Sequence, residues 1–229
     1  MKQDTKISHL FIGHIQKIWP DKPPSAIQKT RCTDVLYLEK TGFKRDQQAD
    51  THHHGGLDKA LHQYPQENYM HWQSEFGNNP RFQAGGFGEN ISTEGLTEKD
   101  LFIGDILSLG QAKVQITQGR QPCWKINAHT HIKTMALRMQ ETGRTGWYYR
   151  VLETGNVKIG DTLSLIDRLN EKWSVHKTTY ARLNRLITPA DAKELSDLTY
   201  LTDNWRAAFL KMAQGEFNED TRARLHTTL

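Results

Sequence analysis

Two eight-residue stretches, IGDILSLG at 103–110 and IGDTLSLI at 159–166, are nearly identical. In each, the Gly-Asp pair is typical of a turn, and the alternating apolar residues that follow are typical of a strand with one buried face. The repetition predicts two similar hairpin corners in one closed or rolled β-sheet.

Short segments rich in β-branched and aromatic residues surround these corners: HLFIGHIQKI at 9–18, DVLYLEK at 34–40, KVQITQ at 113–118 and GWYYRVLET at 146–154. Gly, Pro, Asn and Asp punctuate them, as expected of a domain built from a sheet. One helix is predicted within residues 57–76, with Tyr69, Trp72 and Phe76 on one face and Pro65 at its first position. The sequence therefore predicts a mainly β domain over residues 1–168.

The pattern becomes helical after residue 168. TYARLNRLI at 179–187 has helical apolar spacing, and TPADAKELSDL at 188–198 begins with a Thr cap followed by Pro. DNWRAAFLKMAQG at 203–215 has an apolar face and ends at Gly215. We expect a three-helix C-terminal domain over residues 169–229.

Composition narrows the class of protein. The 229 residues are 36% apolar and 24% charged, with a net charge of +4, which is typical of a globular protein. No apolar run is long enough to span a bilayer and the first residues have no signal-peptide pattern, so we expect a cytoplasmic protein without a membrane partner. The Lys and Arg residues are scattered rather than clustered, which disfavours nucleic-acid binding.

The stretch GRQPCWKINAH at 119–129 places a cysteine in a turn between two cations. Arg120 and Lys125 are placed to lower the pKa of the Cys123 thiol toward thiolate, which is a soft metal ligand or a nucleophile. Cys32 heads a strand pattern in KTRCTDVLYLEK, and we interpret it as structural.

Two further stretches could bind a ligand. In THHHGGLDKALHQYP at 51–65, Gly55 and Gly56 followed by a predicted helix start resemble a backbone anion nest. The alternative is a zinc site formed by four histidines, although no acidic residue at ligand spacing completes it: His52, His54, His129 and His131. GGFGENISTEGL at 85–96 permits close backbone approach to a ligand but lacks the dinucleotide and P-loop signatures, which disfavours NAD binding and ATP hydrolysis.

Three stretches in this order resemble a known family: HGGLDKALHQYP, FGENISTEGLTEKDLFIGDILSLG and ITQGRQPCWKINAH. They are similar to the motifs of MOSC domains, the molybdenum cofactor sulfurase C-terminal domain superfamily, and in particular to its bacterial YiiM-like members. The resemblance implies a MOSC β-barrel followed by a short three-helix domain. Leu57 stands where Pro is frequent, and Arg45-Asp46 stands where a Gly-Asp turn is frequent.

The resemblance also implies a molybdenum cofactor, a mononuclear molybdenum centre held by one pyranopterin. Cys123 occupies the position of the metal-ligating, catalytic cysteine, and the dithiolene supplies two further sulfurs. By position, three segments are expected to bind the cofactor: His54, Gly56, Asp58 and Lys59 in the turn; Gly88, Glu89 and Asn90 in the loop; and Arg120, Gln121 and Lys125 around the cysteine.

The expected activity is reduction of N-hydroxylated small molecules, such as hydroxylaminopurine-type bases, to amines. The chain has no flavin or haem motif, so an external reductase is expected to supply electrons. Two alternatives stay open: a non-catalytic carrier of the molybdenum cofactor, and a sulfur-transfer protein that uses Cys123 as nucleophile. Assembly as a homodimer also stays open.

Overall fold

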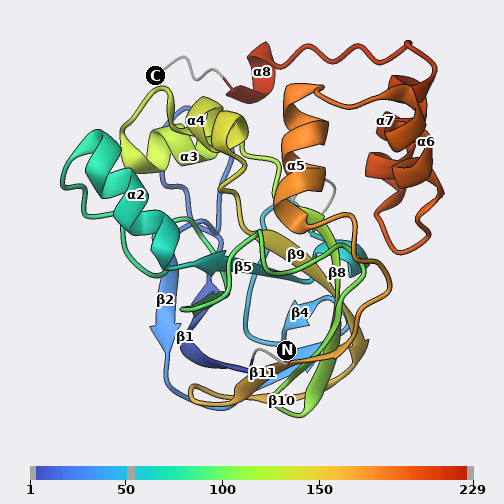
Figure 1. Ribbon diagram of the computed structural model, residues 1–229. Coiled ribbons are helices and arrows are strands. Elements are labelled where there is room, and N and C mark those ends of the chain that lie inside the picture. The colour runs from blue at the N-terminus through green and yellow to red at the C-terminus, as the bar shows by residue number, and fades with distance from the viewer. Residues whose placement is uncertain (1–3, 51–54, 226–229) are drawn as a thin grey trace.

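A seven-stranded barrel forms the lower half of the molecule in Figure 1. The computed structural model describes residues 4–50 and 55–225. Around the barrel the order is β11-β7-β8-β9-β5-β6-β1, and the pairing of Thr5 with Leu163 closes it between β1 and β11. The strands are β1 (Thr5–Gly13), β5 (Leu61–Pro65), β6 (Ile91–Thr93), β7 (Ile106–Leu109), β8 (Ala112–Gly119), β9 (Trp147–Glu153) and β11 (Thr162–Asp167).

Four shorter strands extend this framework. β2 (Lys29–Cys32) pairs with β1, so Cys32 ends this strand instead of heading the next one as predicted. The Cys32 side chain is buried in the core, in agreement with a structural role. A second sheet has the order β10-β3-β4 and consists of β3 (Leu36–Glu39), β4 (Gly42–Phe43) and β10 (Gly155–Val157).

The near-repeated segments form neighbouring antiparallel strands, which confirms the predicted barrel corners. Leu107 in β7 lies opposite Leu165 in β11, and Leu109 lies opposite Leu163. Both Gly-Asp turns need a left-handed glycine, with φ of 88° at Gly104 and 85° at Gly160. Similar sequences therefore adopt similar conformations on either side of one ladder.

Helices cover one end of the barrel (Figure 1). α5 begins at the Ser174 cap and ends at Asn184, so it begins and ends earlier than the predicted segment 179–187. α6 begins at Thr188 with Pro189 at its first turn, as predicted. The helices are α2 (Glu67–Phe76), α3 (Trp124–Thr130), α4 (Met135–Thr142), α5 (Val175–Asn184), α6 (Pro189–Asp197), α7 (Asp203–Ala213) and α8 (Arg222–Leu225), preceded by the 3₁₀ turn η1 (Leu57–Lys59). Among the described residues, none of these helices has the length and apolar character needed to cross a membrane.

Helix α5 packs directly on β8 of the barrel, α7 packs against α5, and α6 packs against α7. Val175, Leu195 and Phe209 belong to one buried cluster with barrel residues such as Val114. At Gly119 a Cβ atom would overlap the hydroxyl of Thr179, so glycine permits the close approach of α5 to β8. The change from strands to helices falls where it was predicted, between β11 and α5; the division into two domains at residue 168 stays a prediction.

The segment around Pro65 differs from the prediction. Residues 61–65 form β5, and Pro65 pairs with Thr93 in β6, so the helix begins only at Glu67. All five β5 residues are buried between β6 and β9, and burial on both faces removes the alternation that identifies a strand. A proline is tolerated at this strand end because Gln66 supplies the next N–H to the Thr93 carbonyl.

Candidate functional site

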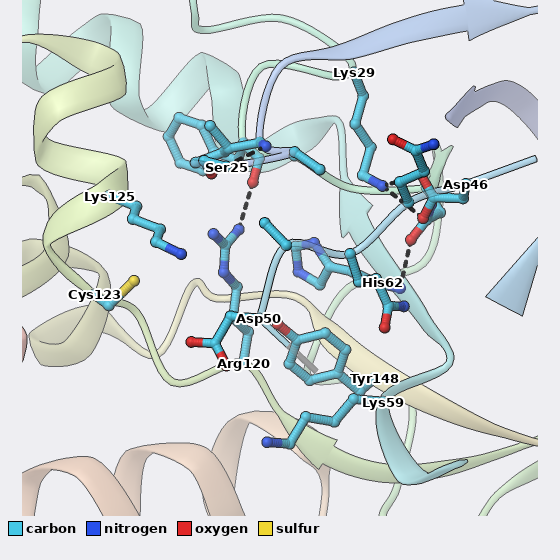
Figure 2. Close-up of a pocket in the computed structure, with 18 residues that line it drawn as sticks. Ser25, Lys29, Asp46, Asp50, Lys59, His62, Arg120, Cys123, Lys125 and Tyr148 are labelled. Atoms are coloured by element: carbon cyan, nitrogen blue, oxygen red, sulfur yellow. Dashed lines mark hydrogen bonds and ion pairs between the residues drawn. The ribbon is translucent and has the colours of Figure 1, made fainter. Parts of the chain in front are cut away.

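A pocket opens at the helix-covered end of the barrel, where side chains from β2, β5, β9 and α3 meet the loops around them (Figure 2). It adjoins an outer recess of about 1000 Å³. Six residues line both hollows and so mark the junction: Ala49, Asp50, Lys59, Cys123, Lys125 and Tyr148. The other lining residues of the inner pocket are Ser25, Ala26, Ile27, Lys29, Asp46, Gln47, Gln48, His62, Phe87, Gly88, Asn90 and Arg120.

Cys123 lies where the chain turns from β8 into α3. Its backbone is extended, with φ of −138° and ψ of 173°, and its carbonyl accepts the first helical hydrogen bond from the N–H of Ile126 at 3.0 Å. The residue is half-buried, and its sulfur points toward the side of the pocket that holds Lys125 and Arg120 (Figure 2). The thiol is therefore accessible from an open hollow instead of sealed in apolar packing.

Basic side chains dominate this pocket: Lys29, Lys59, Arg120 and Lys125 outnumber Asp46 and Asp50. Arg120 is only 7% exposed, and its guanidinium donates to the Phe87 carbonyl at 2.5 Å. Burial lowers the pKa of both Lys29 and Lys59. An excess of partly desolvated cations favours an anionic ligand.

Asp46 holds the inner end of the pocket together. Its carboxylate accepts from the Lys29 ammonium at 2.6 and 2.8 Å, from the Asn90 amide at 2.8 Å and from the Gly13 N–H at 2.6 Å. The Asn90 side chain in turn accepts from the N–H of His62 at 3.2 Å. One carboxylate thereby connects β1, β2, the Gly88–Asn90 loop and β5.

Two neutral titratable groups complete the wall. Burial, with help from Arg120, lowers the pKa of His62 well below its usual value, and its Nε2 lies 3.2 Å from the Thr145 carbonyl. Burial raises the pKa of Tyr148. Neither group carries charge near neutral pH, so the charge of the pocket comes from its lysines, arginine and carboxylates.

Six residues singled out in the sequence do meet at this pocket: Lys59, Gly88, Asn90, Arg120, Cys123 and Lys125. Gln121 lines only the outer recess, where its amide donates to Glu219 at 2.9 Å. Gly56 lines neither hollow, and its φ of 94° lets the chain enter η1. His54 lies outside the described residues.

Two expected cofactor-binding residues face elsewhere. Glu89 is fully buried below the pocket, where its carboxylate accepts from the Tyr69 hydroxyl at 2.7 Å and the Gly85 N–H at 2.6 Å. Asp58 forms an ion pair with Arg150 at 2.6 Å. The helix start predicted after Gly55 and Gly56 is also wrong, because a single 3₁₀ turn and then β5 follow Gly56. Anion binding by the backbone of this turn stays a prediction.

Sequence reasoning missed Lys29, His62 and Tyr148, and it noted Asp46 only as a departure from the family pattern. These residues lie on separate strands or loops that only the closed barrel brings together. Of these residues, only Asp46 could have been identified from the sequence, because it lies in a loop beside a predicted turn, where functional polar residues are common.

The zinc alternative receives no support from the described histidines. His129 is buried in α3, whereas His131 is exposed after its end. Within residues 4–50 and 55–225, no group of three or more His, Cys, Asp or Glu side chains could hold a metal ion. His52 and His54 lie outside these ranges.

His129 predicts a pH-dependent loss of stability. Burial, with Arg81 and Arg120, lowers its pKa from 6.5 to about 4, so between these values the unfolded chain binds the proton that the folded chain refuses. Stability is therefore lost as pH falls from 6.5 to 4, by up to about 3 kcal/mol from this group. The unfolding free energy, measured with urea at several pH values in this range, should fall less steeply with falling pH in His129→Gln than in wild type. An equal dependence on pH in both proteins would contradict the lowered pKa of His129. His131→Gln is the exposed control.

Known proteins of the MOSC domain family are similar to this chain. Residues 50–164 match the family profile described as MOSC domain. Protein YiiM of Escherichia coli K12 is 42% identical over 163 residues, which cover 71% of this chain and 72% of YiiM. A protein titled reductase from Gibberella moniliformis is 37% identical over 153 residues, 66% of this chain but only 27% of that protein.

The fold agrees with these matches. The crystal structure of YiiM from Escherichia coli superposes with a TM-score of 0.82 at 29% identity, covering 98% of this chain and all of that one. The profile match begins before η1 and ends within β11, so it includes Cys123. The chain therefore belongs to the MOSC domain family.

Proposed function

We propose that this chain binds a molybdenum-pyranopterin cofactor through Cys123 and reduces N-hydroxylated small molecules to amines. The observation that carries the proposal is the position of Cys123, half-buried at the junction of a basic pocket and a large recess. A cysteine thiolate is the soft ligand that suits a heavy, sulfur-bound metal. The donor set and the hollow both fit such a cofactor.

The cationic side chains fit the remainder of the group. A pyranopterin carries phosphate and dithiolene charges, and Lys59, Arg120 and Lys125 can neutralise them beside Cys123. Arg120 is held by two backbone carbonyls, since its guanidinium donates to Phe87 and its own N–H donates to Gly146 at 3.1 Å. A pre-fixed guanidinium loses little conformational entropy when it binds an anion.

The outer recess would receive the substrate. Trp124, Pro23 and Pro24 line it with flat apolar surface, while Gln118 and Asn204 add amide donors and acceptors. The Trp124 ring also packs against Trp19, with centroids 5.4 Å apart, which limits its rotation. Flat apolar walls with a few polar groups are typical of pockets that bind planar heteroaromatic molecules.

The cofactor supplies two-electron redox chemistry when bound. Reduction of an N-hydroxylamine consumes two electrons and two protons, and yields an amine and water. The similarity to the Gibberella protein titled reductase supports this reaction class. We further propose an external reductase as electron donor, because no flavin or haem motif was recognised in the sequence.

Steady turnover tests the proposal. Protein purified from a host that makes molybdopterin should reduce a hydroxylaminopurine-type base with reduced viologen as donor, through many cycles at constant molybdenum content. A carrier would instead release its cofactor to an acceptor protein without turnover. A sulfur-transfer protein would show a persulfide on Cys123 by mass spectrometry and no metal requirement. Either outcome would overturn the reductase proposal.

A further inference from the structure

The segment that follows α7 turns back toward the pocket. Residues 216–225, called here the C-terminal strap, cross from α7 over α5 and end at α8 beside α3 and α4 (Figure 1). Glu219, Ala223 and Arg224 of the strap line the outer recess together with Cys123. The strap is therefore one wall of the candidate site, although it lies about 100 residues from Cys123 in the chain.

Glu219 fixes the middle of the strap. Its carboxylate accepts from the Gln121 amide at 2.9 Å and from the Arg182 guanidinium of α5 at 3.0 Å. The Glu219 carbonyl also accepts from Arg185 at 2.6 Å. Arg182 is only 8% exposed at its side chain, so this ion pair is shielded from solvent and from salt.

Arg224 fixes the end of the strap. One guanidinium nitrogen donates to the Pro122 carbonyl at 2.8 Å, and another donates to the Gln140 side chain of α4 at 2.8 Å. Leu225 is buried, and its carbonyl accepts from Asn127 of α3 at 2.8 Å. The strap thus bonds to both helices that follow Cys123.

These contacts converge on the two residues that precede Cys123. The strap holds Gln121 by its side chain and Pro122 by its carbonyl, while the Ile126 N–H holds the Cys123 carbonyl on the other side. A metal ligand performs its role only when its own position is fixed to a fraction of an ångström by a surrounding layer of contacts.

We propose that Arg224 is a positioning residue for Cys123, and that the C-terminal strap completes the cofactor site by fixing the Gln121-Pro122 backbone. The assignment rests on the proposed function, because Cys123 is the ligand that the strap would orient. Arg224 acts through the loop and need not touch cofactor or substrate.

The test compares Arg224→Gln with Arg222→Gln. Arg222 is the matched control, since it lies in the same short helix and its side chain is 84% exposed against Asp220. In cofactor-free protein, the hydrogen-bonded amides of Arg120 and Ile126, which flank the Gln121–Cys123 backbone, should exchange with deuterium about tenfold faster in Arg224→Gln and at the wild-type rate in Arg222→Gln. The exchange rates in Arg224→Lys should lie between those of the other two variants, because lysine keeps one donor for the Pro122 carbonyl.

Metal retention provides the second measurement. Molybdenum affinity should fall about 10- to 100-fold in Arg224→Gln and stay unchanged in Arg222→Gln. The positioning role of Arg224 would be overturned if exchange in Arg224→Gln rose evenly over α5–α7. It would also be overturned if the exchange rates and molybdenum content of Arg224→Gln equalled those of Arg222→Gln. Should wild-type protein hold no molybdenum, the proposed function fails, while the exchange comparison still decides whether the strap fixes the loop.

Discussion

Under the proposed function, replacement of Cys123 by serine is expected to remove at least about nine-tenths of the molybdenum that the wild-type protein would bind, together with the proposed reductase activity. A hydroxyl oxygen is a harder ligand than a thiolate and stays protonated at neutral pH, so it binds a soft metal poorly. The side chain is half-buried at the pocket mouth, so the fold should persist. Elemental analysis measures the molybdenum content per chain, and circular dichroism of the same samples measures whether the fold persists.

Cys32→Ala is the matched control for this experiment. It removes the second thiol of the chain from the barrel core, where Cys32 is only 6% exposed. We expect full metal content and a modest loss of stability, about 1 kcal/mol for the small volume removed. Full molybdenum content in Cys123→Ser would contradict the ligand assignment, whatever the activity of that variant.

The second large effect is expected at Asp46. In Asp46→Asn the buried ammonium of Lys29 loses its counter-charge, and the new amide places an N–H₂ group opposite the donors of Lys29 or Asn90. The Lys29 and Asp46 side chains are only 7% and 2% exposed, so water cannot replace the lost acceptor. Breaking a buried pair in this way should cost about 3 to 5 kcal/mol of unfolding free energy, measured by urea denaturation.

An exposed ion pair in the same part of the chain provides the comparison. Asp34 pairs with Arg45 at 2.7 Å, but both side chains are more than half exposed. Asp34→Asn should leave the urea midpoint unchanged within error, because such pairs contribute little in water. Equal urea midpoints in Asp34→Asn and Asp46→Asn would show that the hydrogen bonds of the buried Asp46 carboxylate do not stabilise the connection between the strands.

The features that local sequence dictates were predictable. The Gly-Asp corners, the Thr188 cap with Pro189 and the stop at Gly215 each depend on a few neighbouring residues, and the structure places all of them as expected. Cys123 was identified in the same way, from the two cations beside it and from the family motif. Such features can be predicted because the residues that determine them lie within one short stretch of sequence.

Features that depend on distant parts of the chain were missed. Lys29 gives no local signal, and it becomes a pocket residue only because β2 pairs with β1 beside the Asn90 loop. Glu89 and Asn90 are neighbours, yet one faces the core below the pocket and the other the pocket wall. The sequence around Pro65 predicts a helix where the structure has a strand, because burial on both faces removes the alternation of apolar and polar residues that identifies a strand.

Closure of the barrel between β1 and β11 also constrains the order of events during synthesis. β1 can pair with β2 and β6 early, but closure of the barrel must wait until about 160 further residues have left the ribosome, since Thr5 pairs with Leu163. The strap bonds to Gln121 and Pro122 later still, because residues 216–225 emerge after the barrel and α5. A nascent chain would therefore lack one wall of the outer recess until residues 216–225 have emerged.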